Sequence, residues 1–245
     1  MRTFGLIGKT LGHSFSKGFF TEKFSAEKIE AQYLNFELNE ISEIETLFEN
    51  NSLSGLNVTV PYKQAIIPYL DGLSDTALAI GAVNVIAFEG EKKIGHNTDA
   101  FGFQQSIKPF LTNDHERALI LGTGGASKAV AHVFQSLGIE VIWISRTPEG
   151  EFQFSYDDIN VHMLRSCKVI VNCTPIGTFP NIEACVPFPF EFLTPVHLCI
   201  DLIYNPEETT FLRLSREQHA TTLNGYSMLK EQALKSWDIW NTSPA

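Results

Sequence analysis

Two charged residues, Lys63 and Asp99, follow apolar runs at positions where strands are expected to end. Lys63 comes after the predicted strand 56–60 and Pro61, so it lies just past the carboxyl end of that strand. Ligands of open α/β sheets bind at this edge, although a lone lysine is usually only solvated. Asp99 ends the sequence N-T-D after the predicted strand 92–96, and capping of a following helix is its alternative role.

Hydroxyl and amide side chains accompany these two charges. Ser14 and Ser16 belong to G-H-S-F-S, a loop that enters a predicted helix. Two hydroxyls beside a helix N-terminus can bind a small carboxylate, and simple capping of that helix is the alternative. Asn84 ends the sequence G-A-V-N, where its amide needs partners in a turn or on a ligand.

A glycine-rich loop, G-T-G-G-A-S, follows a predicted strand that begins at Arg117 and opens a predicted helix. Glycines there let the backbone turn tightly and approach a pyrophosphate, which the helix N–H groups then bind. The third fingerprint position is Ser127 rather than Gly or Ala, so a plain glycine-rich turn is the alternative. The candidate cofactor contacts are Gly122, Gly124, Gly125, Ala126 and Ser127.

The end of the next predicted strand, 140–145, favours NADP over NAD. NAD-binding units usually carry an acidic residue about 20 positions after the glycine loop, where it binds the ribose hydroxyls. The sequence here is S-R-T, so no acid repels a 2′-phosphate and Arg146 offers a planar fork of donors. We therefore predict that NADP is the cofactor.

Short apolar runs alternate with helical patterns along the chain, which predicts a mostly parallel α/β architecture. Asn39 is the expected N-cap of a helix over 40–50, and Gly138 is expected to end the helix after the glycine loop. A domain boundary is expected within 100–116. The expected strands are 3–7, 32–38, 56–60, 83–88, 92–96, 117–122, 140–145, 168–173, 197–203 and 221–223, and the remaining expected helices are 15–28, 102–111 and 227–240.

The composition is that of an ordinary folded protein, with 44% hydrophobic and 19% charged residues in a chain of 245. No apolar run approaches the roughly 20 residues that span a bilayer, and early glycines interrupt any signal-peptide core, so we expect a cytoplasmic protein. The net charge of −10 argues against nucleic acid as a partner. The four cysteines include no C-x-x-C pair, so no metal site is expected.

Together these segments resemble the shikimate dehydrogenase family over nearly the whole chain. The order of N-V-T-x-P-x-K, ending at Lys63, and N-T-D, ending at Asp99, is the most specific part of the resemblance. The other matching motifs are the serine loop, A-V-N at Asn84, G-x-G-G-A-S, R-T at Arg146–Thr147, N-x-T-P-x-G from Asn172, D-x-x-Y-x-P from Asp201 and N-G-x-x-M-L-x-x-Q from Asn224.

The resemblance implies a two-domain α/β enzyme of aromatic amino-acid (chorismate) biosynthesis that interconverts 3-dehydroshikimate and shikimate with NADP. Residues 1–100 and 222–245 would form the substrate domain, to which the C-terminal helix returns. Residues 101–221 would form the Rossmann-type NADP domain, with the reaction in the cleft between the domains. The chain would act on this small molecule as a monomer or homodimer, without a membrane or nucleic acid.

The resemblance also implies a role for each matching residue. Lys63 and Asp99 would stand at the reacting carbon, where ketone reduction needs a proton and stabilisation of an alkoxide. Ser14 and Ser16 would hold the substrate carboxylate, and Asn57 would support the loop. Thr59, Asn84 and Gln232 would bond the ring hydroxyls beside Tyr204, and Thr147, Thr174 and Gly225 would join the cofactor contacts.

Several residues depart from the family pattern. Lys17 replaces a usual Pro after the second serine, Ser145 replaces Asn before Arg146, and Thr178 replaces Met. No basic residue follows R-T closely, and the chain is shortened between Ser145 and Lys168, which implies a milder NADP preference.

Three alternatives stay open. One is a sister enzyme that prefers quinate or NAD. The second is a folate-type methylene dehydrogenase, which would not need both the two serines and N-T-D. The third is an NADP-binding sensor without catalysis, which would be expected to lose Lys63 or Asp99.

Overall fold

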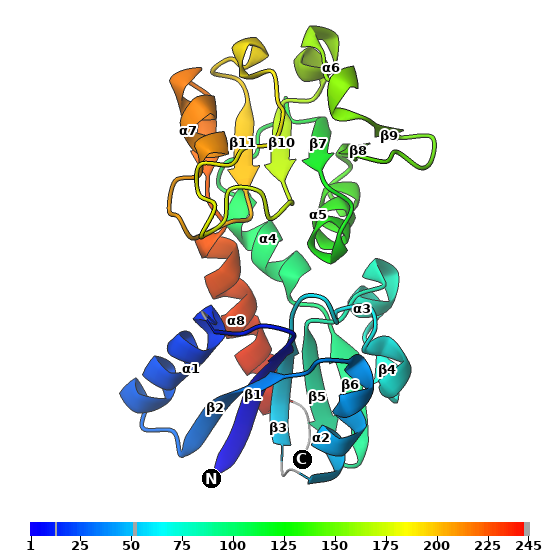
Figure 1. Cartoon of the computed structure of the whole chain (residues 1–245), viewed down its shortest axis with the longest axis vertical. Helices are drawn as coiled ribbons and strands as arrows, with labels where there is room; N and C mark the ends of the chain where they lie inside the picture. The colour runs from blue at the N-terminus through cyan, green and yellow to red at the C-terminus, as the bar shows by residue number, and fades with distance from the viewer. Residues whose placement is uncertain (13, 51–52, 243–245) are drawn as a thin grey trace. The chain divides into compact units, whose positions relative to one another are not determined.

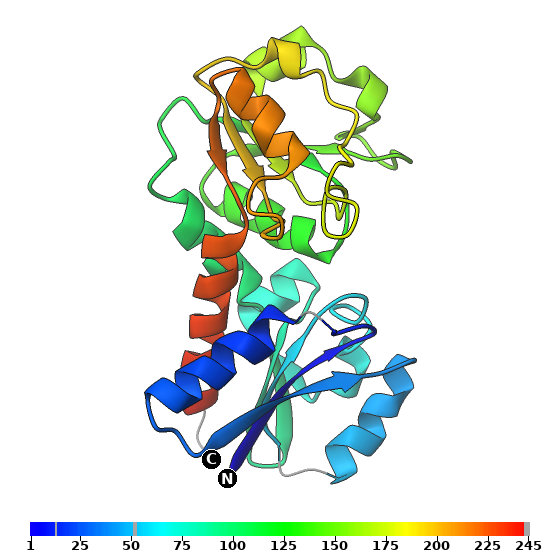
Figure 2. The ribbon, with the colours of Figure 1, turned by 60° about the vertical axis from the view of Figure 1, so that its left-hand side comes forward.

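The computed structural model describes residues 1–12, 14–50 and 53–242. The chain divides into two compact units, each with its own six-stranded sheet (Figures 1 and 2). Unit 1 comprises Met1–Thr98 and Gln232–Ala245, and unit 2 comprises Asp99–Glu231. The predicted two-domain α/β fold class is thereby confirmed.

The sheet of unit 1 has the strand order β2-β1-β3-β5-β6-β4. Strand β1 runs parallel to both β2 and β3, whereas β5 pairs antiparallel with β3 and with β6. The elements of this unit before the final helix are β1 (Arg2–Gly8), α1 (Phe15–Ala26), β2 (Ala31–Glu37), η1 (Ile41–Glu43), α2 (Ile44–Asn50), β3 (Leu53–Val58), η2 (Ile67–Tyr69), β4 (Gly72–Leu73), α3 (Asp75–Ile80), β5 (Val85–Glu89) and β6 (Lys92–His96).

Alternate residues of β1 serve two different cores, as the period of a strand requires. Phe4 faces α1 and the end of the last helix, where its ring centroid lies 4.8 Å from that of Trp240. Ile7 belongs to the opposite core with Ile44 of α2 and Ala77 of α3. The sheet of unit 1 is therefore covered by helices on both faces.

The sheet of unit 2 is entirely parallel, in the order β12-β11-β10-β7-β8-β9. Its elements are α4 (Asp99–Ile107), β7 (Arg117–Leu121), α5 (Gly125–Ser136), β8 (Glu140–Ile144), β9 (Gln153–Phe154), η3 (Tyr156–Asp158), α6 (Val161–Ser166), β10 (Val169–Asn172), η4 (Phe190–Phe192), β11 (Leu198–Asp201), α7 (Thr210–Glu217) and β12 (Thr221–Leu223). Helix α8 (Tyr226–Thr242) begins in unit 2 and continues into unit 1.

Local structure differs from the sequence-based expectations at several element ends. Glu40, not Asn39, caps the turn before α2, because Glu40 and Glu43 form a reciprocal capping box. Helix α4 starts at Asp99, three residues before the expected position. Gly138, in contrast, follows the end of α5 as expected, and its φ of +74° is a conformation that favours glycine. Unit 2 extends to Glu231 and includes Thr221–Leu223 as β12, which pairs with β11.

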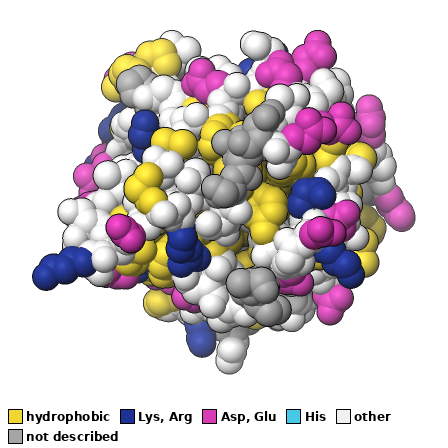
Figure 3. Space-filling model, turned by 90° about the horizontal axis from the view of Figure 1, so that it is seen from below, with side chains coloured by type: hydrophobic (Ala, Val, Ile, Leu, Met, Phe, Trp, Pro, Cys, Tyr) yellow, Lys and Arg dark blue, Asp and Glu magenta, His cyan; other side chains and the backbone are white. Residues whose placement is uncertain are grey.

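Positive and negative side chains are intermixed on one face of the molecule (Figure 3), and two thiols are buried. On the face shown in Figure 3, the Lys and Arg side chains of the described residues are interspersed with Asp and Glu. Burial raises the pKa of Cys167 to about 11 and that of Cys199 to about 12, so both thiols stay protonated at neutral pH. Within 1–12, 14–50 and 53–242, no helix is both long and apolar enough to cross a membrane.

Candidate active site

Lys63 stands in a turn that follows β3 and is anchored on both sides. Thr59 N donates to the Ile7 carbonyl at 2.8 Å, and Tyr62 N donates back to the Thr59 carbonyl at 2.9 Å. The Lys63 carbonyl accepts from Val83 N at 2.7 Å, which places this turn beside the segment that carries Asn84. Half-buried Lys63 and Thr59 are thus held past the carboxyl end of β3, the edge at which α/β sheets bind ligands.

Asn84 and Gln232 meet in a buried cluster of polar groups. Asn84 Oδ1 accepts from Thr98 N at 2.7 Å, while Asn84 Nδ2 donates to Thr98 Oγ1 at 3.0 Å and to Gln232 Oε1 at 3.5 Å. Asn84 is 3% exposed and Gln232 is 8% exposed. Buried amides need such partners, so unit 1 brings these two predicted substrate residues together and fixes their orientation.

Asn57 links this cluster to the serine loop. Tyr33 Oη donates to Asn57 Oδ1 at 2.7 Å, and Asn57 Nδ2 donates to the Asn84 carbonyl at 3.2 Å. Burial raises the pKa of the Tyr33 hydroxyl, and the nearby Ser16 side chain partly offsets this increase. A hydrogen-bonded path therefore runs from Tyr33 through Asn57 to Asn84, and it begins next to Ser16.

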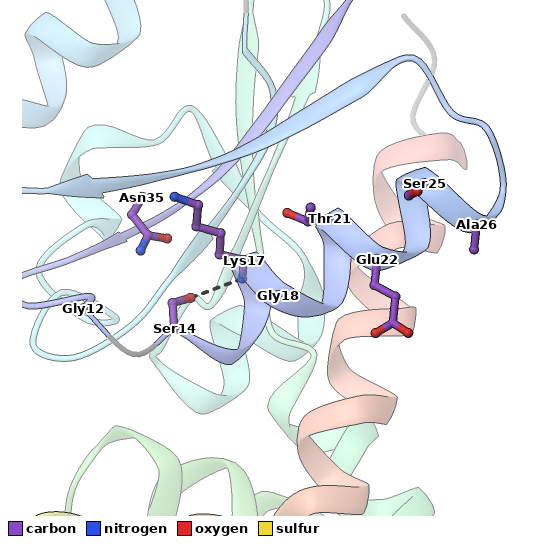
Figure 4. A pocket seen from close by; sticks show the side chains of 9 residues that line it. All are labelled: Gly12, Ser14, Lys17, Gly18, Thr21, Glu22, Ser25, Ala26 and Asn35. Carbon is purple, nitrogen blue, oxygen red and sulfur yellow. Dashed lines mark hydrogen bonds between the residues drawn. The ribbon is translucent and has the colours of Figure 1, made fainter.

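Ser14 caps α1, because its Oγ accepts from Lys17 N at 3.3 Å (Figure 4). Ser14 therefore does cap the helix, as the alternative interpretation proposed. Because its hydroxyl only accepts a hydrogen bond in this role, the O–H can still donate to a ligand. Ser14 opens on a hollow of about 730 Å³ between α1 and β2, where the Lys17 side chain extends toward Asn35. His13, which belongs to the same loop, lies outside the described residues.

Asp99 is the first residue of α4 and is 5% exposed. A carboxylate in the first turn of a helix interacts favourably with the helix dipole, so the capping alternative also has a structural basis here. Asp99 belongs to unit 2, as does the half-buried Tyr204, whose pKa is raised by burial.

The glycine loop lies between β7 and α5 with the geometry that its sequence predicts. Gly122 has φ +103°, a conformation that side chains disfavour, and a Cβ there would lie 3.1 Å from Thr174 Cγ2. Gly124 is the N-cap of α5, and a Cβ there would meet nothing within 4 Å. The backbone at Gly124 is therefore open to the close approach of a ligand.

A pocket of about 350 Å³ in unit 2 collects several predicted cofactor residues. Ser145 locks the turn beside it, because its Oγ donates to the Thr147 carbonyl at 3.1 Å and accepts from Thr147 N at 3.2 Å. Arg146 has no ion pair among the described residues, and those lining the pocket include no carboxylate. The lining residues are Gly122, Thr123, Gly124, Ile144, Ser145, Arg146, Thr147, Tyr156, Cys173, Thr174, Pro175 and Ile176. These groups fit an anionic nucleotide with a 2′-phosphate.

Four predicted cofactor residues do not line this pocket. Gly125 and Ala126 begin α5, and Ser127 is buried with its hydroxyl donating to the Gly124 carbonyl at 2.5 Å. Gly225 has a packing reason to be glycine, since a Cβ there would lie 2.0 Å from the Leu202 carbonyl oxygen. These four residues shape the loop and its surroundings through their backbone geometry and packing.

Sequence reasoning missed four residues of these sites. Tyr33, Thr98 and Ser236 belong to the buried polar cluster of unit 1, and Tyr156 lines the nucleotide pocket. No sequence motif contains Tyr33, Ser236 or Tyr156. Thr98 could have been found, because it is the middle residue of N-T-D.

Comparison with known proteins identifies the family. The family profile described as "Shikimate dehydrogenase substrate binding domain" matches residues 6–86. The shikimate dehydrogenase (NADP(+)) of Clostridium beijerinckii is 36% identical over 251 residues, which cover 98% of this chain and 92% of that protein.

Solved structures agree with this relationship. Shikimate dehydrogenase 1 from Peptoclostridium difficile has a TM-score of 0.85 at 37% identity, covering all of this chain and 93% of that one. Shikimate 5-dehydrogenase from Thermus thermophilus, solved in complex with NADP(H) and shikimate, has a TM-score of 0.87 at 28% identity, covering 100% and 95%. The predicted family is confirmed: the chain belongs to the shikimate dehydrogenases.

Proposed function

We propose that this chain interconverts 3-dehydroshikimate and shikimate with NADP(H), with Lys63 and Asp99 at the reacting carbon. The activity follows from membership of the family, whose curated members carry this name and match almost the whole chain. The structural observation that best supports it is that the Lys63 backbone bonds to Val83, the residue before Asn84, while Asn84 itself bonds to Gln232.

The substrate is a small carboxylate whose ring carries hydroxyls, and unit 1 offers donors for both kinds of group. The hydroxyls of Ser14 and Ser16 would bind the carboxylate at the start of α1. Thr59, Asn84 and Gln232 would bind the ring hydroxyls, because amides and hydroxyls both donate and accept hydrogen bonds. Tyr204 would line the same cleft.

Ketone reduction requires a hydride, which NADPH supplies, and a proton for the oxygen. As the new C–H bond forms, the C=O π electrons move to the oxygen, and an ammonium at Lys63 would stabilise that charge and transfer the proton. Asp99 would hold the ammonium and bond a neighbouring hydroxyl. In the oxidative direction, neutral Lys63 would accept the hydroxyl proton.

On the cofactor side, the open backbone at Gly124 and the tight turn at Gly122 would accommodate the pyrophosphate at the start of α5. Arg146 and Thr147 would bind the 2′-phosphate, and Thr174 would contact the cofactor from the end of β10. Gly125, Ala126, Ser127 and Gly225 would act through the backbone geometry that they permit or maintain.

The experiment that tests this function follows cofactor reduction at 340 nm with shikimate or quinate as substrate and NADP or NAD as cofactor, in all four combinations. We expect strong activity only with shikimate and NADP. Activity with quinate or NAD would be compatible with the proposed Lys63–Asp99 site but would assign the chain to a related enzyme with a different substrate or cofactor preference. No activity in any combination would contradict the enzymatic assignment and favour the sensor.

Three further properties remain predictions from sequence. These are the cytoplasm as the place of action, a monomeric or homodimeric state, and the absence of nucleic acid as a partner. Gel filtration with light scattering would decide the second.

A further inference from the structure

The nucleotide pocket of unit 2 has a lining residue with no assigned role, Tyr156 of η3. It lines the pocket together with Ser145, Arg146 and Thr147, the turn predicted to bind a 2′-phosphate. No basic residue follows Thr147 closely, since Pro148, Glu149 and Gly150 come next. Tyr156 is therefore a candidate for a second polar contact to the phosphate beside Arg146.

Strand pairing brings Tyr156 to this turn. Strand β9 pairs in parallel with β8, with Ile144 opposite Phe154, and Ser145 N donates to the Phe154 carbonyl at 2.9 Å. In this parallel register, the segment that follows β8, which contains Arg146, lies next to the segment that follows β9, which contains Tyr156. The shortened connection between the two strands thus delivers Tyr156 to the edge at which Arg146 stands.

The position of Tyr156 is held by its neighbours. Ser155 caps η3, and both its N and its Oγ donate to Asp158 Oδ2 at 2.7 Å. The Tyr156 ring packs against the core cluster that contains Leu121 and Ile144. A residue fixed in this way loses little conformational entropy when it binds a ligand.

The polar ends of Arg146 and Tyr156 are available to a ligand. Within residues 1–12, 14–50 and 53–242, the Tyr156 hydroxyl has no hydrogen-bond partner and the Arg146 guanidinium has no ion pair. Burial raises the pKa of Tyr156 by more than the neighbouring Arg146 lowers it, so the phenol stays protonated at neutral pH. The pocket therefore presents a neutral O–H donor next to a cation.

We infer that the Tyr156 hydroxyl donates a hydrogen bond to the 2′-phosphate of NADP(H), in the place of the basic residue that is missing after Thr147. This inference rests on the proposed NADP-dependent function and adds a specificity-determining residue to it. A phosphate dianion accepts such a bond strongly, whereas NAD, which has a hydroxyl at this position, gains less from it.

The test measures binding directly, by calorimetry with adenosine 2′,5′-bisphosphate and with 5′-AMP. Tyr156→Phe removes only the hydroxyl, and we expect it to weaken binding of the bisphosphate about tenfold, with 5′-AMP unchanged. Tyr69→Phe, in unit 1, is the matched control and should change neither affinity. Unchanged bisphosphate affinity in Tyr156→Phe, or equal weakening for both nucleotides, would overturn the inference.

A second variant and the wild type separate the possible failures. If Tyr156→Phe has no effect while Tyr156→Ala weakens both nucleotides equally, the ring contacts the adenosine and the hydroxyl role is refuted. If the wild type binds the bisphosphate no more tightly than 5′-AMP, the NADP preference itself fails, and this inference fails with it. Tight bisphosphate binding by the wild type with no change in Tyr156→Phe refutes the inference alone.

Discussion

Asn57 Nδ2 donates to Ser236 Oγ at 3.1 Å, although the two residues lie 179 positions apart in the chain. Ser236 is fully buried, and its hydroxyl also donates to the Gln232 carbonyl at 2.8 Å and lies 3.3 Å from Thr98 Oγ1. This hydrogen bond connects α8 to β3 next to Asn84 and Gln232, the amides proposed to bind the substrate. The orientation of Gln232 therefore depends on a serine one helical turn further along.

Replacing Ser236 by alanine should affect stability and substrate binding together. Ser236→Ala leaves polar groups of Asn57 and Thr98 with one partner fewer, at a cost of about 1–3 kcal/mol in the free energy of unfolding. We expect the KM for shikimate to rise several-fold and the dissociation constant of NADP to stay unchanged. Ser215→Ala, at another buried helix serine, is the control and should lower stability without changing the shikimate KM.

Loss of the Lys63 ammonium should reduce turnover far more than cofactor binding. We expect Lys63→Ala to lower kcat roughly 10²–10⁴-fold, because the proton donor and the charge that stabilises the alkoxide are lost together. NADPH affinity, measured by fluorescence titration, should stay within a factor of two. Lys92→Ala, at an exposed lysine of the same unit, should behave as wild type. Near-normal turnover in Lys63→Ala would refute its catalytic role.

Arg146 should discriminate between the two nicotinamide cofactors. Arg146→Ala removes a charged donor for the 2′-phosphate, so the KM for NADP should rise about tenfold or more while the KM for NAD changes little. Steady-state kinetics with both cofactors measures the difference. Arg165→Ala provides an exposed arginine of the same unit for comparison. Equal increases for both cofactors would show that Arg146 does not read the 2′-phosphate.

The pH dependence of stability should contain a contribution from Asp201. Burial raises the pKa of this carboxyl from 3.8 to about 6, against the hydrogen bonds from Ile203 N, Thr209 and Asn172 that lower it. Because the folded-state pKa is the higher one, the folded protein binds more protons between these two values. The Asp201 contribution is therefore fully present below about pH 4 and is lost as the pH rises through 6.

Urea unfolding of the wild type and of Asp201→Asn at pH 5 and pH 7 tests this assignment. Relative to Asp201→Asn, the wild type should gain about 1 kcal/mol in free energy of unfolding on going from pH 7 to pH 5. An equal pH response in both proteins would show that Asp201 does not titrate in this range.

Gly225 should tolerate no side chain. A Cβ there would lie 2.0 Å from the Leu202 carbonyl oxygen, and the Gly225 N–H donates to the Ile203 carbonyl at 3.0 Å. We expect Gly225→Ala to destabilise the protein by roughly 1–3 kcal/mol in thermal or urea unfolding. Gly18→Ala in α1, where a Cβ meets nothing within 4 Å, should instead stabilise it by about 0.5–1 kcal/mol. Similar values for the two variants would contradict this interpretation.

Most strands were predictable because their apolar runs are buried on both faces, as in β10, where all four residues are buried. The helices α3 and α6 were missed because six residues contain too few turns for a helical period to emerge, and the amphipathic α7 was missed although its apolar residues follow a helical period. Their caps, Ser74, Asn160 and Thr209, were visible signals, but such residues are just as common in turns.

The residues of the proposed site also fall into two groups, those that could be predicted from the sequence and those that could not. Lys63, Asp99 and Arg146 lie in local motifs, so their types and spacing indicate them directly. Ser236 and Tyr156 owe their positions to tertiary contacts, one through a helix from the end of the chain and the other through the β8–β9 register. A single sequence does not encode such long-range proximity in any local pattern.

Helix α8 has a consequence for the order in which the chain can fold during synthesis. Most of unit 1 precedes unit 2 in the chain, yet its core includes Trp240, whose ring packs in a tilted arrangement against Phe4 and whose Nε1 donates to the Ile86 carbonyl at 3.1 Å. Unit 2 is complete in sequence at Glu231. On the ribosome, the segments of unit 1 that precede Asp99 must therefore wait for α8, and their aromatic core stays incomplete until unit 2 has been synthesised.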